Sequence, residues 1–104
     1  MDDIKEPGPG AADPAAQALI TWDKPTQEKF QQMIGKIPIF LRGIAQDKVS
    51  RKAESIVKKD NRREVSEKDM VDAFFLETPF GFHGPMKCDM EELGIDYTKF
   101  GYKK

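Results

Sequence analysis

The stretch that decides the fold runs from Lys36 to Arg42 and reads Lys-Ile-Pro-Ile-Phe-Leu-Arg. Pro38 separates two helical patterns, because a proline disfavours helical geometry in the residue before it. Upstream of Pro38, apolar residues recur at the spacing of one helix face, at Phe30, Met33, Ile34 and Ile37. This pattern predicts a first helix that begins after Asp23, an N-capping residue type, with Pro25 in its first turn.

The stretch after Pro38 predicts a long central helix. Its apolar positions repeat every three or four residues over about five turns, at Leu41, Ile44, Ala45, Val49, Ala53, Ile56 and Val57. Asp60-Asn61 predicts the end of this helix, and a short extended link follows over residues 62–65. Ser66, followed three residues later by Asp69, partly matches a capping box and predicts a third helix that Thr78-Pro79 ends.

The chain divides into three parts of different composition. Residues 1–19 are rich in Pro, Gly, Ala and Asp, with too little apolar content to offset the entropy of ordering, so they predict a disordered leader. Residues 20–77 predict a small all-α domain of three helices, short, long and short. Residues 78–104 form an aromatic-rich C-terminal tail, partly helical over 86–93, that packs on the domain or on a partner. No internal repeat is apparent.

Composition and charge exclude several classes of function. The formal net charge of the 104 residues is −1, whereas compact DNA-binding proteins are usually basic. The one cysteine, Cys88, cannot form an intrachain disulfide. The acidic start does not resemble a signal peptide, and no apolar run is long enough to cross a membrane, so we expect a soluble, cytoplasmic protein. A chain this short buries only about 60% of its unfolded surface, which disfavours a large internal active site.

A set of positions spread over the three predicted helices matches a known pattern. These positions are, in order, Trp22, Ile37, Pro38, Phe40, Leu41, Arg42, Ala53, Val65, Ser66, Met70 and Ala73. They resemble the PCP_red family, a small helical domain found at the C-terminus of one subunit of light-independent protochlorophyllide reductase. The resemblance covers about residues 20–75 and departs from the family at Ser50, where an acidic residue is usual.

The resemblance implies the fold and an association with reductase assemblies. The enzyme of that family is a nitrogenase-like, iron–sulfur, ATP-driven reductase of a chlorophyll precursor, so the family name implies an oxidoreductase. No catalytic constellation is visible in this chain, because one cysteine cannot supply the roughly four ligands of an iron–sulfur cluster and no Gly-rich phosphate loop is present. Whether the chain is an enzyme stays open, and we predict no catalytic residue, no cofactor and no metal.

The candidates for binding a ligand or a partner are Trp22, Pro38, Phe40, Arg42, Phe100 and Tyr102. Arg42 falls in the first turn of the long helix, where the helix dipole and free backbone N–H groups favour an anion such as a propionate or a phosphate. The structural alternative is a salt bridge or cap contact from Arg42 to Glu64 or Asp69.

Two further clusters have both a functional and a structural interpretation. One contains imidazole and sulfur groups, at His83, Met86, Cys88 and Met90. These groups suit a soft metal or a tetrapyrrole, but we favour a role in the packing of the tail. The other cluster is basic and comprises Lys58, Lys59, Arg62 and Arg63. Cations at the C-terminal end of a helix are stabilised by the helix dipole, and they can also bind phosphate. We prefer the interpretation that these cations stabilise the helix.

Two functions from different classes agree with these observations. We expect a non-catalytic accessory or binding module of a nitrogenase-like or tetrapyrrole redox system, which binds a redox enzyme subunit or a tetrapyrrole-like ligand through the stretch from Pro38 to Arg42 and the aromatic tail. The alternative is a histone-fold-like nucleic-acid-binding protein, because the order of short, long and short helices matches that fold. The net charge and the short connection at Gly35–Pro38 argue against nucleic acid as a partner.

Overall fold

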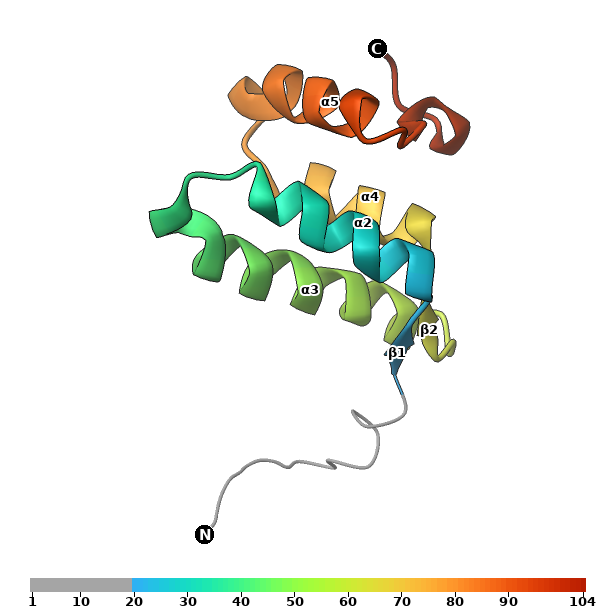
Figure 1. Ribbon diagram of the computed structural model, residues 1–104. Helices are drawn as coiled ribbons and strands as arrows, with labels where there is room; N and C mark the ends of the chain where they lie inside the picture. Colours follow the sequence, from blue (N-terminus) through green and yellow to red (C-terminus); the bar gives the residue numbers. More distant parts are fainter. Residues whose placement is uncertain (1–19) are drawn as a thin grey trace, which may run out of the picture.

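The computed structural model of the protein describes residues 20–104 and consists mainly of helices (Figure 1). The leader predicted over residues 1–19 lies outside the described residues. The predicted all-α class is confirmed, since the strands are two residues long. In chain order the elements are β1 Thr21–Trp22, α2 Lys24–Gly35, the 3-10 helix η1 Ile39–Leu41, α3 Arg42–Lys59, β2 Glu64–Val65, α4 Glu67–Glu77, the 3-10 helix η2 Phe80–Phe82, α5 His83–Glu92 and the 3-10 helix η3 Tyr97–Phe100. Among the helices of residues 20–104, none combines the length and the apolar composition that crossing a membrane requires.

Local signals set the ends of α2, α3 and α4. Asp23 precedes α2 and Pro25 lies in its first turn, but the Asp23 carboxylate accepts a hydrogen bond from the Thr26 hydroxyl at 2.9 Å and none from the helix backbone. Asn61 follows α3 with a φ of 57°, a left-handed conformation that asparagine tolerates better than most residues. The carboxylate of Asp69 accepts hydrogen bonds from the N–H and the hydroxyl of Ser66, both at 2.9 Å, so the predicted capping box opens α4.

The core lies where α2, α3 and α4 meet, and the tail closes it. Ala53, in the middle of α3, is fully buried, and so small a side chain lets α4 lie close to α3. The buried apolar residues are Phe30, Met33, Ile34, Val49, Ala53, Val57, Val65, Met70, Val71, Ala73, Phe74, Phe75, Met86, Met90, Ile95 and Tyr97. The last four come from residues 78–104, so the tail is part of the core.

The tail packs on the three-helix domain through its last helix and its aromatic residues. α5 begins at His83, before the predicted start at residue 86, and runs on the side of α2 and α4 that is remote from α3 (Figure 1). The ring of Tyr102 stacks on Phe75 of α4 with the ring centroids 3.9 Å apart. The Tyr102 hydroxyl donates a hydrogen bond to the Asp72 carboxylate at 2.5 Å. The end of the tail is therefore attached to α4 by both stacking and a polar contact.

A short parallel pair of strands joins the start of the described chain to the link after α3. Thr21 pairs with Glu64 and Trp22 with Val65. The Asp23 N–H extends the pair by donating to the Val65 carbonyl at 3.0 Å. The sequence predicts the extended link but not its pairing with β1, because two-residue strands are too short to produce a periodic signal.

Candidate functional site

The proline stretch forms a tight corner between α2 and α3. Pro38 has the extended backbone angles φ −50° and ψ 140°, and η1 then turns the chain into α3. The Arg42 side chain reaches back over this corner, where its Nε donates to the Ile37 carbonyl at 2.7 Å and its Nη2 to the Gly35 carbonyl at 2.8 Å. Arg42 therefore satisfies the carbonyl of the last residue of α2 and a second carbonyl just beyond the helix.

The predicted contact of Arg42 with Glu64 or Asp69 is wrong. Both acidic residues follow the far end of α3, and a helix of 18 residues separates the two ends by about 27 Å. Asp69 pairs instead with Arg62, at 2.7 Å. The position of Arg42 in the first turn of α3 is confirmed, but its donors point to backbone carbonyls of the preceding helix.

A second corner with the same construction joins α4 to α5. Pro79 has φ −57° and ψ 146°, η2 follows, and His83 opens α5. The His83 Nε2 lies 2.9 Å from the Thr78 carbonyl, so the first helical residue again contacts the carbonyl five positions before it. The sequence around each corner has the order Pro, apolar, any residue, apolar, basic or His, Gly, over 38–43 and 79–84. The chain therefore contains a short structural repeat, and these two six-residue stretches are its trace in the sequence.

A groove of about 530 Å³ lies between the two corners. One side is formed by the start of α3, and the other by the start of α5, while the C-terminal ends of α2 and α4 lie between them (Figure 1). The apolar residues of its lining are Met33, Ile37, Pro38, Leu41, Ile44, Ala45, Val49, Phe74, Pro79, Phe82, Pro85 and Met86. The groove is thus an apolar surface built from residues about forty positions apart in the chain.

Large apolar side chains around the groove are exposed. Phe80 of the second corner is 87% exposed, and Phe40 and Ile39 of the first corner are 78% and 77% exposed. Further exposed apolar surface inside the groove comes from Ile44, Phe82 and Leu41. We call these six residues together the corner face.

The charges that line the groove are divided into paired and unpaired groups. Lys36 forms an ion pair with Glu92, and this hydrogen bond is the main reason that the pKa of Lys36 is raised, with a further contribution from Asp89. Glu77 lies 3.7 Å from Lys52 of α3. Within residues 20–104, neither Lys48 on the α3 side nor Asp89 on the α5 side forms an ion pair with an N–O distance of 4 Å or less, although Asp89 lies close enough to Lys36 to contribute to its raised pKa. The two sides of the groove therefore each carry one unpaired charge, and the signs are opposite.

The predicted binding residues fall into separate places. Pro38, Phe40 and Arg42 meet at the first corner, and Pro38 lines the groove. Trp22 lies at the other end of α3, where its Nε1 donates to Glu54 at 2.9 Å, so it does not join them. The rings Phe100 and Tyr102 pack partly buried against the core. Sequence reasoning missed the second corner, although the repeated spacing of proline, apolar and glycine residues is a signal for it.

The cluster of imidazole and sulfur groups does not converge. Met86 and Met90 are buried in the core, whereas Cys88 is exposed. His83 uses Nε2 at the corner and contacts the ring of Phe75 edge-on, with centroids 5.1 Å apart. Over residues 20–104, no group of three or more His, Cys, Asp or Glu side chains is arranged to hold a metal ion.

The basic cluster at the end of α3 is partly used inside the chain. Arg62 donates to both carboxylate oxygens of Asp69, at 2.7 and 2.9 Å, and also contacts Asp60 at 3.1 Å. The hydrogen bond to Asp69 is the main cause of the raised pKa of Arg62. Lys58 and Lys59 are exposed in the last turn of α3, where cations are favoured by the helix dipole.

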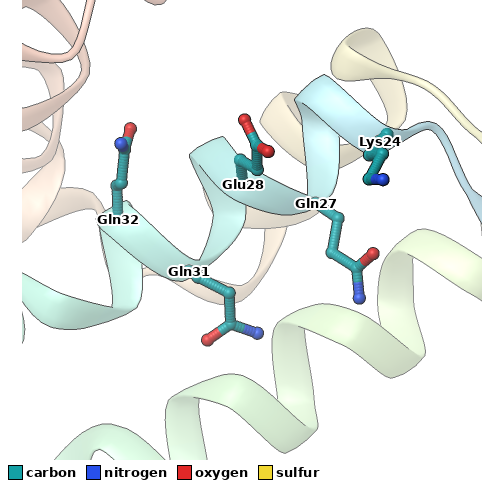
Figure 2. A pocket seen from close by; sticks show the side chains of 5 residues that line it. All are labelled: Lys24, Gln27, Glu28, Gln31 and Gln32. Atoms are coloured by element: carbon teal, nitrogen blue, oxygen red, sulfur yellow. The ribbon is translucent and has the colours of Figure 1, made fainter.

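A second hollow of about 420 Å³ lies along the outer surface of α2. Figure 2 shows that its polar side chains all rise from this one helix and point in different directions; they are Lys24, Gln27, Glu28, Gln31 and Gln32. A surface lined by one helix does not enclose a ligand. The groove between the corners is the better candidate site.

Comparison of the chain with models of protein families, with curated proteins and with solved structures gives no match.

Proposed function

We propose that this protein is a non-catalytic binding module that docks a protein partner on the corner face. The observation that carries the proposal is the exposure of three large apolar side chains that line one apolar groove and of three more on the two corners beside it. An exposed apolar patch larger than a few hundred Å² marks an interaction site on most proteins. The proposal assigns no reaction to the groove, because its lining is mainly apolar and its charged groups are few.

The proposed partner is a redox enzyme subunit of a nitrogenase-like reductase assembly. The resemblance to the PCP_red family supports this choice, and Pro38, Phe40 and Arg42, which belong to the resembling pattern, build the first corner. A tetrapyrrole-like molecule is a proposed ligand of the same groove, because about 530 Å³ lies within the range of roughly 300–1,000 Å³ typical of small-molecule sites.

The histone-fold-like alternative rests on the order of α2, α3 and α4 and on the exposed cations Lys58 and Lys59. It needs the basic cluster to face a phosphate backbone. Arg62 is less suited to that role, because its guanidinium is engaged by Asp69 and Asp60. We therefore keep nucleic acid as an outcome of the test rather than as the proposal.

The test is an anaerobic capture of partners by the tagged protein from its own cells, with an absorbance spectrum taken before mass spectrometry. Ile44→Asp places a charge in the groove, and Leu76→Asp is the matched control on α4, because Leu76 is also largely exposed but does not line the groove. We expect reductase subunits with the wild type and Leu76→Asp but not with Ile44→Asp.

A tetrapyrrole band that is lost in Ile44→Asp and kept in Leu76→Asp would identify the ligand of the groove. Recovery of DNA and nucleoid proteins in place of reductase subunits would contradict the proposal and favour the histone-like alternative. Equal recovery of the reductase by both variants would mean that docking does not use the corner face.

A further inference from the structure

The corner face is larger than the apolar patch of an ordinary monomer. An aromatic side chain presents about 150–250 Å², so three largely exposed phenylalanines and three aliphatic side chains amount to roughly 700 Å². The largest patch on a typical monomer covers about 300–600 Å². A standard interface buries about 800 Å² on each partner. The face therefore has the area that one side of a stable dimer needs.

The shape of the face is complementary to itself. Phe40 and Phe80 are 78% and 87% exposed at the two corners, and the groove of about 530 Å³ lies between the corners. An isologous dimer requires that one patch contain both the projecting and the receiving parts, because each copy uses the same surface. The corner face meets this requirement, since the two corners have the same backbone construction on opposite sides of the groove.

The unpaired charges follow the same symmetry. Lys48 lies six positions after Arg42, and Asp89 lies six positions after His83, so the two occupy equivalent places behind the two corners. A two-fold axis along the groove would place the α3 side of one copy over the α5 side of the other. Lys48 of each copy would then face Asp89 of the other, and both charges would gain the partners that residues 20–104 do not give them.

We propose that a second copy of this chain covers the corner face, in a symmetric dimer with Lys48 opposite Asp89 of the other copy. The proposal rests on the corner face being the docking surface assigned above, and it adds a control on access to that surface. A second copy and a protein partner then compete for the same surface.

Charge reversal tests this arrangement by sedimentation of the purified full chain over a range of concentrations. Lys48→Glu alone sets two carboxylates against each other at both contacts of the dimer, and Asp89→Lys alone sets two ammonium groups against each other there. We expect each variant to weaken the dimer roughly tenfold or more, because like charges in an interface are costly. An equal mixture of the two variants restores a dimer, because every facing pair again has opposite signs.

Lys24→Glu is the control, because it makes the same change in net charge as Lys48→Glu at the opposite end of α2 from the groove. We expect it to dimerise like the wild type, and circular dichroism checks that every variant is folded. A wild type that stays monomeric overturns the proposal, as does a dimer that the single reversals leave unchanged or that the mixture does not restore.

The two proposals fail in different ways. A monomeric wild type that still captures reductase subunits removes the dimer and leaves the binding function in place. A dimer that obeys the charge-reversal pattern but captures no reductase subunit keeps this inference and removes the proposed partner.

Discussion

At the scale of single residues, Asp69 joins the link after α3 to the start of α4. Its side chain is only 3% exposed and accepts hydrogen bonds from Ser66 and from both terminal nitrogens of Arg62. Burial opposes ionisation of this carboxyl, but the hydrogen bonds from Arg62 and Ser66 outweigh burial and hold the pKa of Asp69 below its ordinary value. One carboxylate thus serves as helix cap and as ion-pair partner.

We expect Asp69→Asn to lower the free energy of unfolding by about 2 kcal/mol, the loss of a helix cap together with a charged hydrogen bond. Urea denaturation measures the change. Asp60→Asn is the control, because Asp60 contacts the same arginine from the solvent, and exposed ion pairs contribute little. If the two variants lost the same free energy of unfolding, the burial of Asp69 would not increase its contribution to stability.

The lowered pKa of Asp69 gives the stability a defined dependence on pH. A carboxyl group whose pKa is lower in the folded than in the unfolded state stabilises the fold above its unfolded pKa, about 3.9 for aspartate. We expect this contribution to disappear as the pH falls from about 4 through the folded pKa. Denaturation curves of the wild type should show the decline, and Asp69→Asn should show less of it.

Tyr102 holds the end of the tail by two separable contacts. Tyr102→Phe keeps the stack on Phe75 and removes the hydrogen bond to Asp72, so we expect a loss of about 1 kcal/mol. Tyr102→Ala removes both contacts and should cost about 2 kcal/mol, less than the roughly 3–5 kcal/mol of a fully buried aromatic residue. Thermal melting compares them with Leu76→Ala, an exposed control on α4 that lies outside the corner face. Unchanged melting of Tyr102→Ala would mean that the tail end does not contribute to stability.

At the scale of elements, the two corners show how a short signal sets the path of the chain. In each corner a proline ends one helix, and the first residue of the next helix contacts the carbonyl just before the proline. Arg42 contacts two backbone carbonyls before its proline, those of Gly35 and Ile37, whereas His83 contacts one, that of Thr78. The first corner should therefore be the more rigid of the two.

We expect Arg42→Met to lower the free energy of unfolding by about 1–2 kcal/mol, because two hydrogen bonds to the end of α2 are lost while the apolar part of the side chain is kept. Arg42→Lys retains one donor and should lose less. Denaturation of both variants checks the order. A larger loss in Arg42→Lys would contradict the role of the guanidinium at this corner.

The elements that the sequence predicts are those with local signals. The apolar period of α3, the proline at residue 38 and the pairing of Ser66 with Asp69 all lie within a few residues, and the structure confirms the helices that they predict. The β1–β2 pair and the groove depend on residues that are about forty positions apart. No pattern within one helix indicates such contacts, so the second corner, which carries Phe80 and Phe82 of the corner face, escaped prediction.

At the scale of the whole molecule, the tail completes a core that three helices cannot close. Ile95 and Tyr97 are each 1% exposed, and Met90 is fully buried. The Tyr97 hydroxyl donates a hydrogen bond to Glu91, and this bond, followed by burial, raises the pKa of Tyr97 to about 12. The predicted domain of residues 20–77 therefore lacks part of its own interior.

We expect a chain that ends at Gly94 to melt roughly 25 °C or more below the full chain, because it loses the buried Ile95 and Tyr97 together with the contacts of Tyr102. Each kcal/mol shifts the melting temperature of so small a domain by about 4–8 °C. Circular dichroism follows the transition. The truncated chain should also bind more of a dye that recognises exposed apolar surface. An unchanged melting temperature would mean that α2, α3 and α4 are stable alone.

The parallel pairing of β1 with β2 has a consequence for the order of folding. Thr21 and Glu64 are joined across a loop of about forty residues, and closing such a loop costs about 3 kcal/mol of chain entropy. The few backbone hydrogen bonds of two short strands offset little of this entropic cost. We therefore expect α3 and α4 to meet first, with the strand pair forming late. The backbone amides of Thr21 and Asp23 should exchange with solvent hydrogen sooner than those in the middle of α3.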